Sequence, residues 1–225
     1  MTTQTIVSMP PAQGVGFRRS LMSNDPSILT EIHKDQANIA IWQRDFPKEL
    51  KHAAKLVVDH TPTLQISLSL SSENVYTPIN QALGETPTSE VLSQDIAGLI
   101  DMFCCLFDLQ RVGLKLTVLD HVMCPRFHAD QVPCRLVTTY QGEATEWLPH
   151  HVVDRTKLGP GSRGKPDEES GLYHGADQVN QLKAGEVALL KGELWVGNEN
   201  AGLVHRSPQL HSGQKRLLLT IDFME

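Results

Sequence analysis

The spacing of hydrophobic residues predicts two helices in the first half of the chain. After Pro47, apolar side chains recur at intervals of three and four residues, which is the spacing of one helix face. A longer stripe with the same spacing begins at Pro87 and continues to about Leu109. Proline suits the first turn of a helix because its missing N–H would have no partner there. We therefore expect one helix after residue 47 and a longer one from residue 87.

A period of two residues predicts β-strands. It appears twice before the long helix and dominates the chain after it. The expected strands are residues 38–43, 64–70, 112–118, 126–130, 135–140, 186–191, 203–207 and 216–223. Helices followed by a run of short strands predict an α+β fold that is mainly β. Such a chain forms a sandwich or barrel with the N-terminal helices packed on one outer face.

The chain length of 225 residues fits one domain. Residues 1–24 have few periodic apolar positions, so we expect a loosely ordered N-terminal segment followed by a single domain over residues 25–225. Within that domain, residues 149–181 are polar and rich in glycine and proline. Loops longer than about 12–15 residues are usually functional or disordered. We interpret residues 149–181 as a lid-like loop over a site, with a passive surface insertion as the alternative.

Charge and composition narrow the classes of partner. The net charge of −6 argues against a nucleic-acid-binding protein, which would carry a basic stripe. No apolar run approaches the roughly 20 residues of a membrane-spanning helix. The first residues lack the basic and apolar regions of a secretory signal. We therefore expect a cytoplasmic protein with a small-molecule substrate, and neither nucleic acid nor membrane as a partner.

Three residues in two predicted strands form a candidate metal site. His128 and Asp130 are two residues apart, so in a strand both side chains point to the same face. His205, in a later predicted strand, is the leading candidate for a third ligand. Two histidines and one carboxylate on one face of an octahedral ion leave the remaining positions open, as in non-haem Fe(II) oxygenases. The order of these residues along the chain therefore predicts an open metal site.

Arg216 begins the last predicted strand, 216–223. Odd-numbered positions of this strand are apolar and should pack on a helix or a sheet. Arg216 then shares the other face with Leu218 and Thr220, toward a ligand. A guanidinium placed there would bind a carboxylate through two hydrogen bonds.

Two cysteines leave the identity of the metal open. Cys124 and Cys134 flank the His-x-Asp motif on either side. Thiolates are soft ligands that favour Zn²⁺ over Fe(II), so either cysteine would convert the site into a zinc site if it reached the ion. The alternative is that both cysteines pack as small apolar side chains.

Three further residues near the motif are candidates for contact with substrate or with the ligands. Arg126 has the strand parity of His128 and would meet an anionic substrate, and Arg135 follows the motif. Either arginine would otherwise support a metal-binding carboxylate or lie at the surface. Tyr140 would donate its hydroxyl to a bound acid, or be half-buried in its strand.

The H-x-D…H…R pattern resembles that of the 2-oxoglutarate- and Fe(II)-dependent dioxygenases. These enzymes have a double-stranded β-helix, also called a jelly-roll or cupin-like fold. The resemblance implies that His128, Asp130 and His205 bind Fe(II). It also implies that Arg216 binds the distal carboxylate of 2-oxoglutarate as cosubstrate. Barrels of this kind often dimerise through edge strands, so a homodimer is an expectation by analogy.

A longer pattern is similar to an uncharacterised bacterial family known as a domain of unknown function. The likeness extends over roughly residues 25–225. It rests on the sequence Cys-Pro-Arg-Phe-His-Ala-Asp at 124–130, and on residues 140–142, 147–148, 185–192 and 205–208. No activity is settled for this family. The resemblance therefore indicates a family but implies no reaction.

Two functions follow from these patterns. The first is a 2-oxoglutarate- and Fe(II)-dependent oxygenase that uses the His-x-Asp…His triad. The second is a cupin-like protein that binds zinc or another metal in metal handling or sensing, without oxygenase activity. The sequence has no G-x-S-x-G, Walker or dinucleotide-binding glycine pattern, which argues against those hydrolases and nucleotide-binding enzymes.

Overall fold

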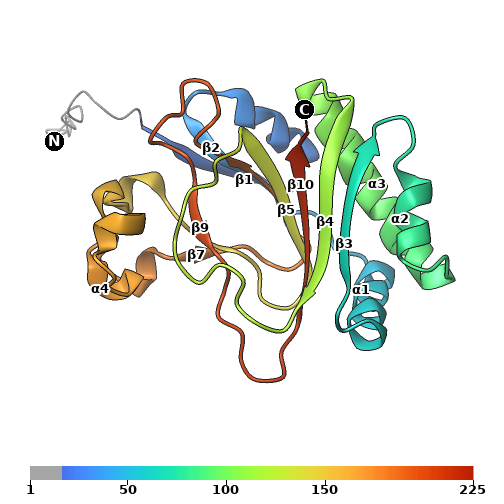
Figure 1. Cartoon of the computed structure of the whole chain (residues 1–225). Helices are drawn as coiled ribbons and strands as arrows, with labels where there is room; N and C mark the ends of the chain where they lie inside the picture. Colours follow the sequence, from blue (N-terminus) through green and yellow to red (C-terminus); the bar gives the residue numbers. More distant parts are fainter. Residues whose placement is uncertain (1–16, 225) are drawn as a thin grey trace, which may run out of the picture.

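A seven-stranded sheet, here called the large sheet, forms the centre of the molecule (Figure 1). The computed structural model describes residues 17–224. The strand order in the large sheet is β1-β2-β8-β5-β10-β4-β3. Its strands are β1 (Arg19–Ser23), β2 (Ala37–Trp42), β3 (Gln65–Ser71), β4 (Arg111–Leu119), β5 (Cys134–Gln141), β8 (Val187–Lys191) and β10 (Arg216–Phe223).

Three α-helices cover one face of the large sheet (Figure 1). They are α1 (Lys48–His60), α2 (Tyr76–Ala82) and α3 (Pro87–Phe107), and the 3-10 helix η1 (Pro26–His33) packs on the same face. Thr86 and Ser89 form a reciprocal capping box at the start of α3. The helices bury their predicted apolar stripes, so the expected helical layer is present. The short α2, which contains Pro78, was not expected from the sequence.

The two faces of β10 show how the sheet separates core from site. Leu217, Leu219 and Ile221 are buried in the main core beneath the helices. Arg216, Leu218 and Thr220 alternate with them and line a cavity on the opposite face. The alternation in the sequence predicts this division, because successive strand residues point to opposite faces.

A three-stranded sheet, here called the small sheet, lies against the other face of the large sheet. Its order is β7-β6-β9, with β6 (Glu146–Leu148), β7 (Asn180–Gln181) and β9 (Val204–Arg206). Trp147 and Leu203 from this side pack with Val137 and Leu190 of the large sheet in a second core. The molecule is thus a mixed α/β fold, mostly sheet with few helices.

The N-terminal segment is more regular than the sequence suggests. We expected residues 1–24 to be loosely ordered, but Arg19–Ser23 form β1, paired in parallel with β2. The segment RSLMS has no clear alternation of apolar and polar residues. It forms a strand because it pairs with β2. The rest of the expectation, for residues 1–16, lies outside the described residues.

The segment 149–181 is packed on the body of the protein. It contains four 3-10 helices, namely η2 (His150–Val152), η3 (Arg155–Lys157), η4 (Gly159–Ser162) and η5 (Ala176–Gln178), the single turn α4 (Asp167–Ser170), and β7. Leu172 and Tyr173 from this segment form a third apolar cluster with Phe127 and Val204. Within residues 17–224, no helix combines the length and hydropathy needed to cross a membrane.

Candidate metal centre

Two histidines face each other across an isolated antiparallel bridge. The N–H of His128 donates to the carbonyl of His205 at 3.0 Å, and the N–H of His205 donates to the carbonyl of His128 at 2.9 Å. Paired residues of such a bridge project to the same side, and the two imidazole centres lie 4.6 Å apart. The strand expected over residues 126–130 is reduced to this bridge, which is enough to align the rings.

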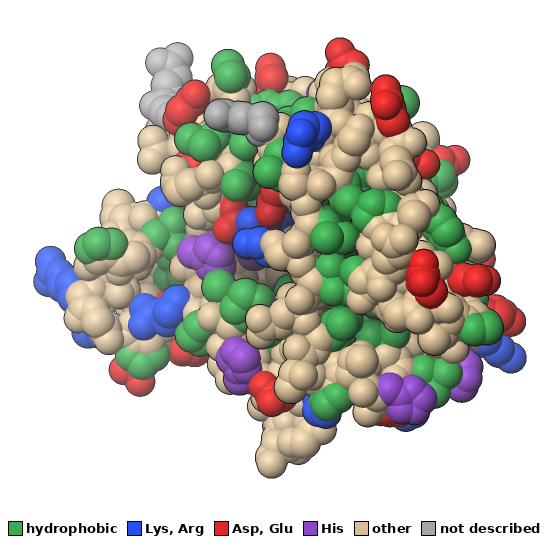
Figure 2. All heavy atoms as spheres, turned by 45° about the vertical axis from the view of Figure 1, so that its right-hand side comes forward, with side chains coloured by type: hydrophobic (Ala, Val, Ile, Leu, Met, Phe, Trp, Pro, Cys, Tyr) green, Lys and Arg blue, Asp and Glu red, His purple; other side chains and the backbone are tan. Residues whose placement is uncertain are grey.

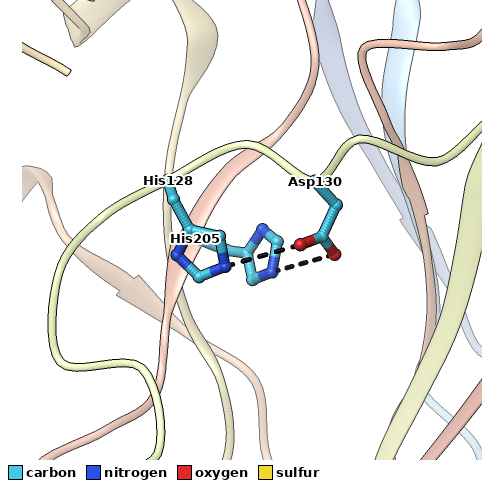
Figure 3. Close-up of side chains that lie close together, drawn as sticks. All are labelled: His128, Asp130 and His205. Atoms are coloured by element: carbon cyan, nitrogen blue, oxygen red, sulfur yellow. Dashed lines mark ion pairs between the residues drawn. The ribbon is translucent and has the colours of Figure 1, made fainter. Parts of the chain in front are cut away.

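The carboxylate of Asp130 completes the group (Figure 3). Its two oxygens lie 3.4 Å from Nε2 of His128 and 3.5 Å from Nε2 of His205. The N–H of Glu193 donates to the backbone carbonyl of Asp130 at 2.9 Å and fixes its position. One ligand atom of each of the three side chains lies within 4.8 Å of the other two. The structure therefore brings together the three candidate ligands.

Backbone carbonyls set the tautomers of both histidines. Nδ1 of His128 lies 2.9 Å from the carbonyl oxygen of Arg126, and Nδ1 of His205 lies 3.2 Å from that of Leu203. A carbonyl oxygen only accepts hydrogen bonds, so Nδ1 carries the proton in each neutral ring. Each Nε2 then offers a lone pair toward Asp130, which is the arrangement of metal-binding histidines.

The electrostatic surroundings of Asp130 and His205 favour the protonation states in which these side chains bind a metal. Burial lowers the pKa of His205 to about 4, so this ring is neutral at pH 7. Burial alone would raise the pKa of Asp130. The hydrogen bond from His128, the charge that His205 carries at acid pH and the charge of Arg135 outweigh burial and lower that pKa to about 2. The hydrogen bond that His128 donates to Asp130 raises the pKa of His128. Asp130 is thus an anion and His205 a free base at neutral pH.

The donor set fits a divalent metal ion. Ligand atoms about 2.1 Å from an ion, with bond angles near 90°, lie about 3 Å apart. The separations of 3.4 and 3.5 Å therefore require only a small contraction. Two imidazole nitrogens and one carboxylate form the 2-His-1-carboxylate set, which leaves coordination positions for other ligands.

His128 and His205 line a cavity of about 340 Å³ on the face of the large sheet away from the helices. Figure 2 shows a histidine and several charged side chains gathered beside a hollow on this face. The buried Arg216 lines the same cavity with only 1% of its surface exposed. The cavity therefore joins the candidate metal centre to a buried cation.

Arg216 is held by hydroxyl groups and not by a carboxylate. Its Nη2 donates to Oγ1 of Thr145 at 2.6 Å and to Oγ1 of Thr139 at 3.0 Å, and its Nε donates to Thr139 at 3.2 Å. No carboxylate among residues 17–224 lies within ion-pair distance. Burial lowers the pKa of Arg216 to about 10, so the guanidinium remains charged at neutral pH. A buried cation without a counter-ion is costly, and a bound anion would compensate it.

Gly142 explains how this part of the site is built. Its φ is +86°, and a Cβ at this position would lie 2.4 Å from the carbonyl oxygen of Lys215. Only glycine combines this conformation with so close an approach of two backbones. Gly142 lies between Thr139 and Thr145 in the chain, so the contact holds the start of β10 beside both hydroxyl partners of Arg216.

The two arginines that flank the motif have different roles. Nη1 of Arg135 donates to Asp130 at 2.6 Å, while its Nε and Nη2 bind the carboxylate of Asp222 at 2.7 and 3.0 Å. Arg135 therefore orients a candidate ligand. The side chain of Arg126 points away from the cavity and donates to Asp167 at 2.7 Å. Only its backbone carbonyl, bound to His128, touches the site.

The structure does not bring Tyr140 or Cys134 to the site. Both are buried in the core on the helix side of the large sheet, because even-numbered residues of β5 face the helices and odd-numbered residues face the cavity. Burial also raises the pKa of the Cys134 thiol. Cys124 lines the cavity, but it is not one of the three residues whose ligand atoms converge.

The segment 149–181 braces both histidine-bearing strands. The buried carboxylate of Asp167 accepts from Nε of Arg126 at 2.7 Å and from the N–H of Phe127 at 2.8 Å. Arg206, next to His205, donates to Glu168 at 2.9 Å and to Glu146 at 2.7 Å. Side-chain contacts therefore tie α4 to the residues beside each histidine. We call this set of contacts the brace.

Sequence reasoning missed several residues of the site. Asp222 and Arg216 are both even-numbered residues of the same strand, so their side chains lie on the same face. This spacing would have placed Asp222 on the cavity side. The hydroxyls of Thr139 and Thr145 and the carboxylate of Asp167 carried no signal, because their roles depend on contacts between segments distant in the chain.

Residues 23–222 match the family described as "Protein of unknown function (DUF1826)". The chain belongs to the DUF1826 family. The match covers every residue of the candidate metal centre. No curated protein matches the chain.

Two solved structures share the fold of this DUF1826 protein. One is dioxygenase for auxin oxidation 1 of Arabidopsis thaliana in complex with 2-oxoglutarate, at 9% identity and a TM-score of 0.50, covering 92% of each chain. The other is a proposed oxygenase from Shewanella oneidensis, at 7% identity and a TM-score of 0.51, covering 91% of this chain and 89% of the other. At such identities the likeness shows the fold alone.

The position of Tyr140 in this DUF1826 protein gives a first prediction. Its hydroxyl donates to Asp95 at 2.6 Å, and Arg44 binds both oxygens of the same carboxylate. Tyr140→Phe removes one buried hydrogen bond to a charged group, so we expect the free energy of unfolding to fall by about 1.5 kcal/mol. Metal affinity should not change. Denaturant unfolding and a metal titration test both parts, and a weakened metal site would contradict this placement.

The brace gives a second prediction. Asp167→Asn removes the charge that Arg126 contacts and weakens the bond from Phe127, so we expect a loss of about 2 kcal/mol in unfolding free energy. Because Phe127 precedes His128, metal affinity should fall as well. Glu169→Gln, at an exposed position of α4, is the matched control. Thermal unfolding and metal titration of both variants measure the effect, and equal behaviour of the two variants would refute the brace.

Proposed function

We propose that this protein is a 2-oxoglutarate- and Fe(II)-dependent oxygenase built on a double-stranded β-helix. One observation carries the proposal. A 2-His-1-carboxylate group and a buried arginine without a carboxylate partner share one cavity. The metal group requires further ligands, and the arginine requires an anion. A keto acid with a distal carboxylate satisfies both.

The sheet topology supports the fold assignment. β4, β10, β5 and β8 are consecutive antiparallel neighbours in the large sheet. The His128 bridge, β9, β6 and β7 form the opposing layer. Strands consecutive in the chain therefore alternate between the two layers from β4 to β6, which is the course of a double-stranded β-helix.

Each residue of the site has a role in this proposal. His128, Asp130 and His205 would hold Fe(II), and Arg135 would keep Asp130 ionised and oriented. Arg216 would bind the distal carboxylate of the keto acid, with Thr139 and Thr145 fixing the guanidinium. When bound, Fe(II) and the keto acid supply the activation of dioxygen for oxidation of a substrate C–H bond.

Apolar side chains complete the cavity between the two ends. Val137, Leu190 and Leu218 line it together with the charged residues. They would exclude water from the space between Arg216 and the histidines, which strengthens the pairing of Arg216 with a carboxylate. The substrate would enter from the open side of the cavity.

The zinc-binding alternative draws less support from the site. A closed zinc site needs a fourth protein ligand such as a thiolate. Cys134 lies in the core on the other face of the large sheet. Cys124 lines the cavity, but its thiol is not among the ligand atoms that converge.

An anaerobic titration of 2-oxoglutarate into the Fe(II)-loaded protein tests the proposal. We expect one metal ion per chain and a saturable visible charge-transfer band, because the keto acid would chelate the ion. The tag must contain no histidine, so that bound metal reports the site alone.

The same titration with succinate is the matched control, since succinate has the distal carboxylate but lacks the keto group. It should give no band. One metal ion per chain without a band for 2-oxoglutarate would reject the oxygenase and favour the metal-handling alternative. Cys124→Ser would then be expected to lower metal affinity.

A further inference from the structure

We propose that the cavity binds a small substrate carrying an anionic group, carboxylate or phosphate, and that Lys115 of β4 is its partner. This inference rests on the proposed function, because it names the substrate class of the same site. It is drawn from the charges that line the cavity and from the register of β4 against β10.

The charged lining of the cavity is entirely basic within the part of the chain that the structure describes. Lys115, Arg135, Arg206 and Arg216 line it with histidines, and no aspartate or glutamate does. This bias is notable in a chain of net charge −6. A cleft lined by charge of one sign concentrates ligands of the opposite sign. Arg135 and Arg206 are paired with carboxylates behind the lining, so the preference for anions comes from Lys115 and Arg216.

Among the described residues, Lys115 is the cation of the cavity lining that has no carboxylate partner and no assigned ligand. Arg135 binds Asp130 and Asp222, and Arg206 binds Glu146 and Glu168. Arg216 is assigned to the keto acid. No ion pair joins Lys115 to a carboxylate in residues 17–224. Its ammonium is thus available for a ligand.

The strand register places Lys115 apart from Arg216 and at the metal end. Lys115 pairs with Thr220, four residues along β10 from Arg216. At about 3.4 Å per residue the two rows are about 14 Å apart. A keto acid that spans from Arg216 to the metal has its distal carboxylate at Arg216 and therefore well apart from the row of Lys115.

Lys115 shares the cavity lining with the candidate ligands His128 and His205. Asp222, two residues beyond Thr220, is joined through Arg135 to Asp130. A substrate group held at Lys115 would thus position the rest of a small molecule near the metal.

The mouth of the cavity is polar and open. Gln65 and Lys115 are exposed, whereas Arg216 is buried. β3 and β4 lie at the edge of the large sheet, on the side away from the segment with α4 (Figure 1). Cavities of about 340 Å³ are at the low end of those that hold small ligands. Both the volume and the mouth fit a small polar molecule.

Titration calorimetry with matched probes tests this inference. Benzoate and phenyl phosphate are compared with the neutral benzamide, and hexanoate with hexanamide, on anaerobic protein loaded with Fe(II) and 2-oxoglutarate. We expect the anions to bind more tightly than their amides. Lys115→Gln should reduce this preference by about two- to fivefold, the size of one exposed charge pair. Lys115→Arg should retain it.

Lys183→Gln is the matched control, because Lys183 is exposed and lies outside the cavity lining. It should keep the anion preference. Absence of any anion preference in the wild-type protein overturns the inference, as does an equal loss in both glutamine variants. If Lys115→Gln instead weakens the binding of 2-oxoglutarate by the same factor, Lys115 serves the keto acid and the inference is wrong.

The two proposals fail in different ways. The visible band of the keto acid complex, measured first on the same sample, reports the proposed function. A normal band without anion preference rejects only the role of Lys115. A missing band rejects the oxygenase itself and, with it, the site on which the role of Lys115 rests.

Discussion

Replacing Asp130 with alanine should abolish metal binding in this protein. Asp130 supplies the only carboxylate among the three converging side chains, and its pKa of about 2 keeps it charged at every pH at which the protein would be assayed. Its loss leaves two neutral imidazoles for a hard divalent cation that prefers oxygen ligands. We expect metal affinity to fall by at least about 100-fold, because removal of outer partners alone costs 10–100-fold.

The fold of the variant should be preserved. The bond from Glu193 to residue 130 uses the backbone carbonyl, and Arg135 keeps its two contacts with Asp222. Asp120→Ala is the matched control, since that carboxylate is exposed and pairs only with His121 among the described residues. Metal titration with circular dichroism measures both variants. A stoichiometric metal ion in folded Asp130→Ala would remove this residue from the site.

The sequence predicted the parts of the site that depend on local periodicity. The side-chain parity of β10 placed Arg216, Leu218 and Thr220 on the cavity side, and the spacing of His128 and Asp130 suggested a shared direction. The prediction for β10 holds because a strand alternates its side chains regardless of its partners. His128 and Asp130 converge although their segment forms only a single bridge. The same alternation excludes a site role for Tyr140 and Cys134, because even-numbered residues of β5 face the helices. Cys134 is instead buried as a small apolar side chain, which was the alternative for it.

Features that depend on contacts between distant segments were not predictable. Nothing in residues 149–181 indicates that Asp167 binds Phe127, so the contacts that tie this segment to the body of the protein could not be predicted. β1 becomes a strand by pairing with β2, and the bridge at His128 replaces an expected strand. In each case the partner and not the local pattern determines the structure.

Replacing Arg216 with methionine separates the structural from the functional reading of this residue. A structural arginine stabilises the protein, whereas a buried cation without a carboxylate partner reduces stability in the absence of its ligand. Methionine fills similar space without the charge. We therefore expect an unchanged or higher Tm for the free protein. Affinity for 2-oxoglutarate should fall by at least about 100-fold, which is close to 3 kcal/mol.

Arg135→Met provides the matched comparison on the same face of the sheet. Arg135 binds two carboxylates. Its loss leaves Asp222 as an unpaired, partly buried anion and Asp130 with only the two histidines, and should lower the Tm. We therefore expect the Tm to change in opposite directions in Arg216→Met and Arg135→Met. A Tm that falls as far in Arg216→Met as in Arg135→Met, with keto acid affinity retained, would make Arg216 structural. If the Tm rises in Arg216→Met and falls in Arg135→Met, and Arg216→Met loses affinity for 2-oxoglutarate, then Arg216 binds the ligand. The buried guanidinium then lowers the stability of the free protein in return for binding the keto acid.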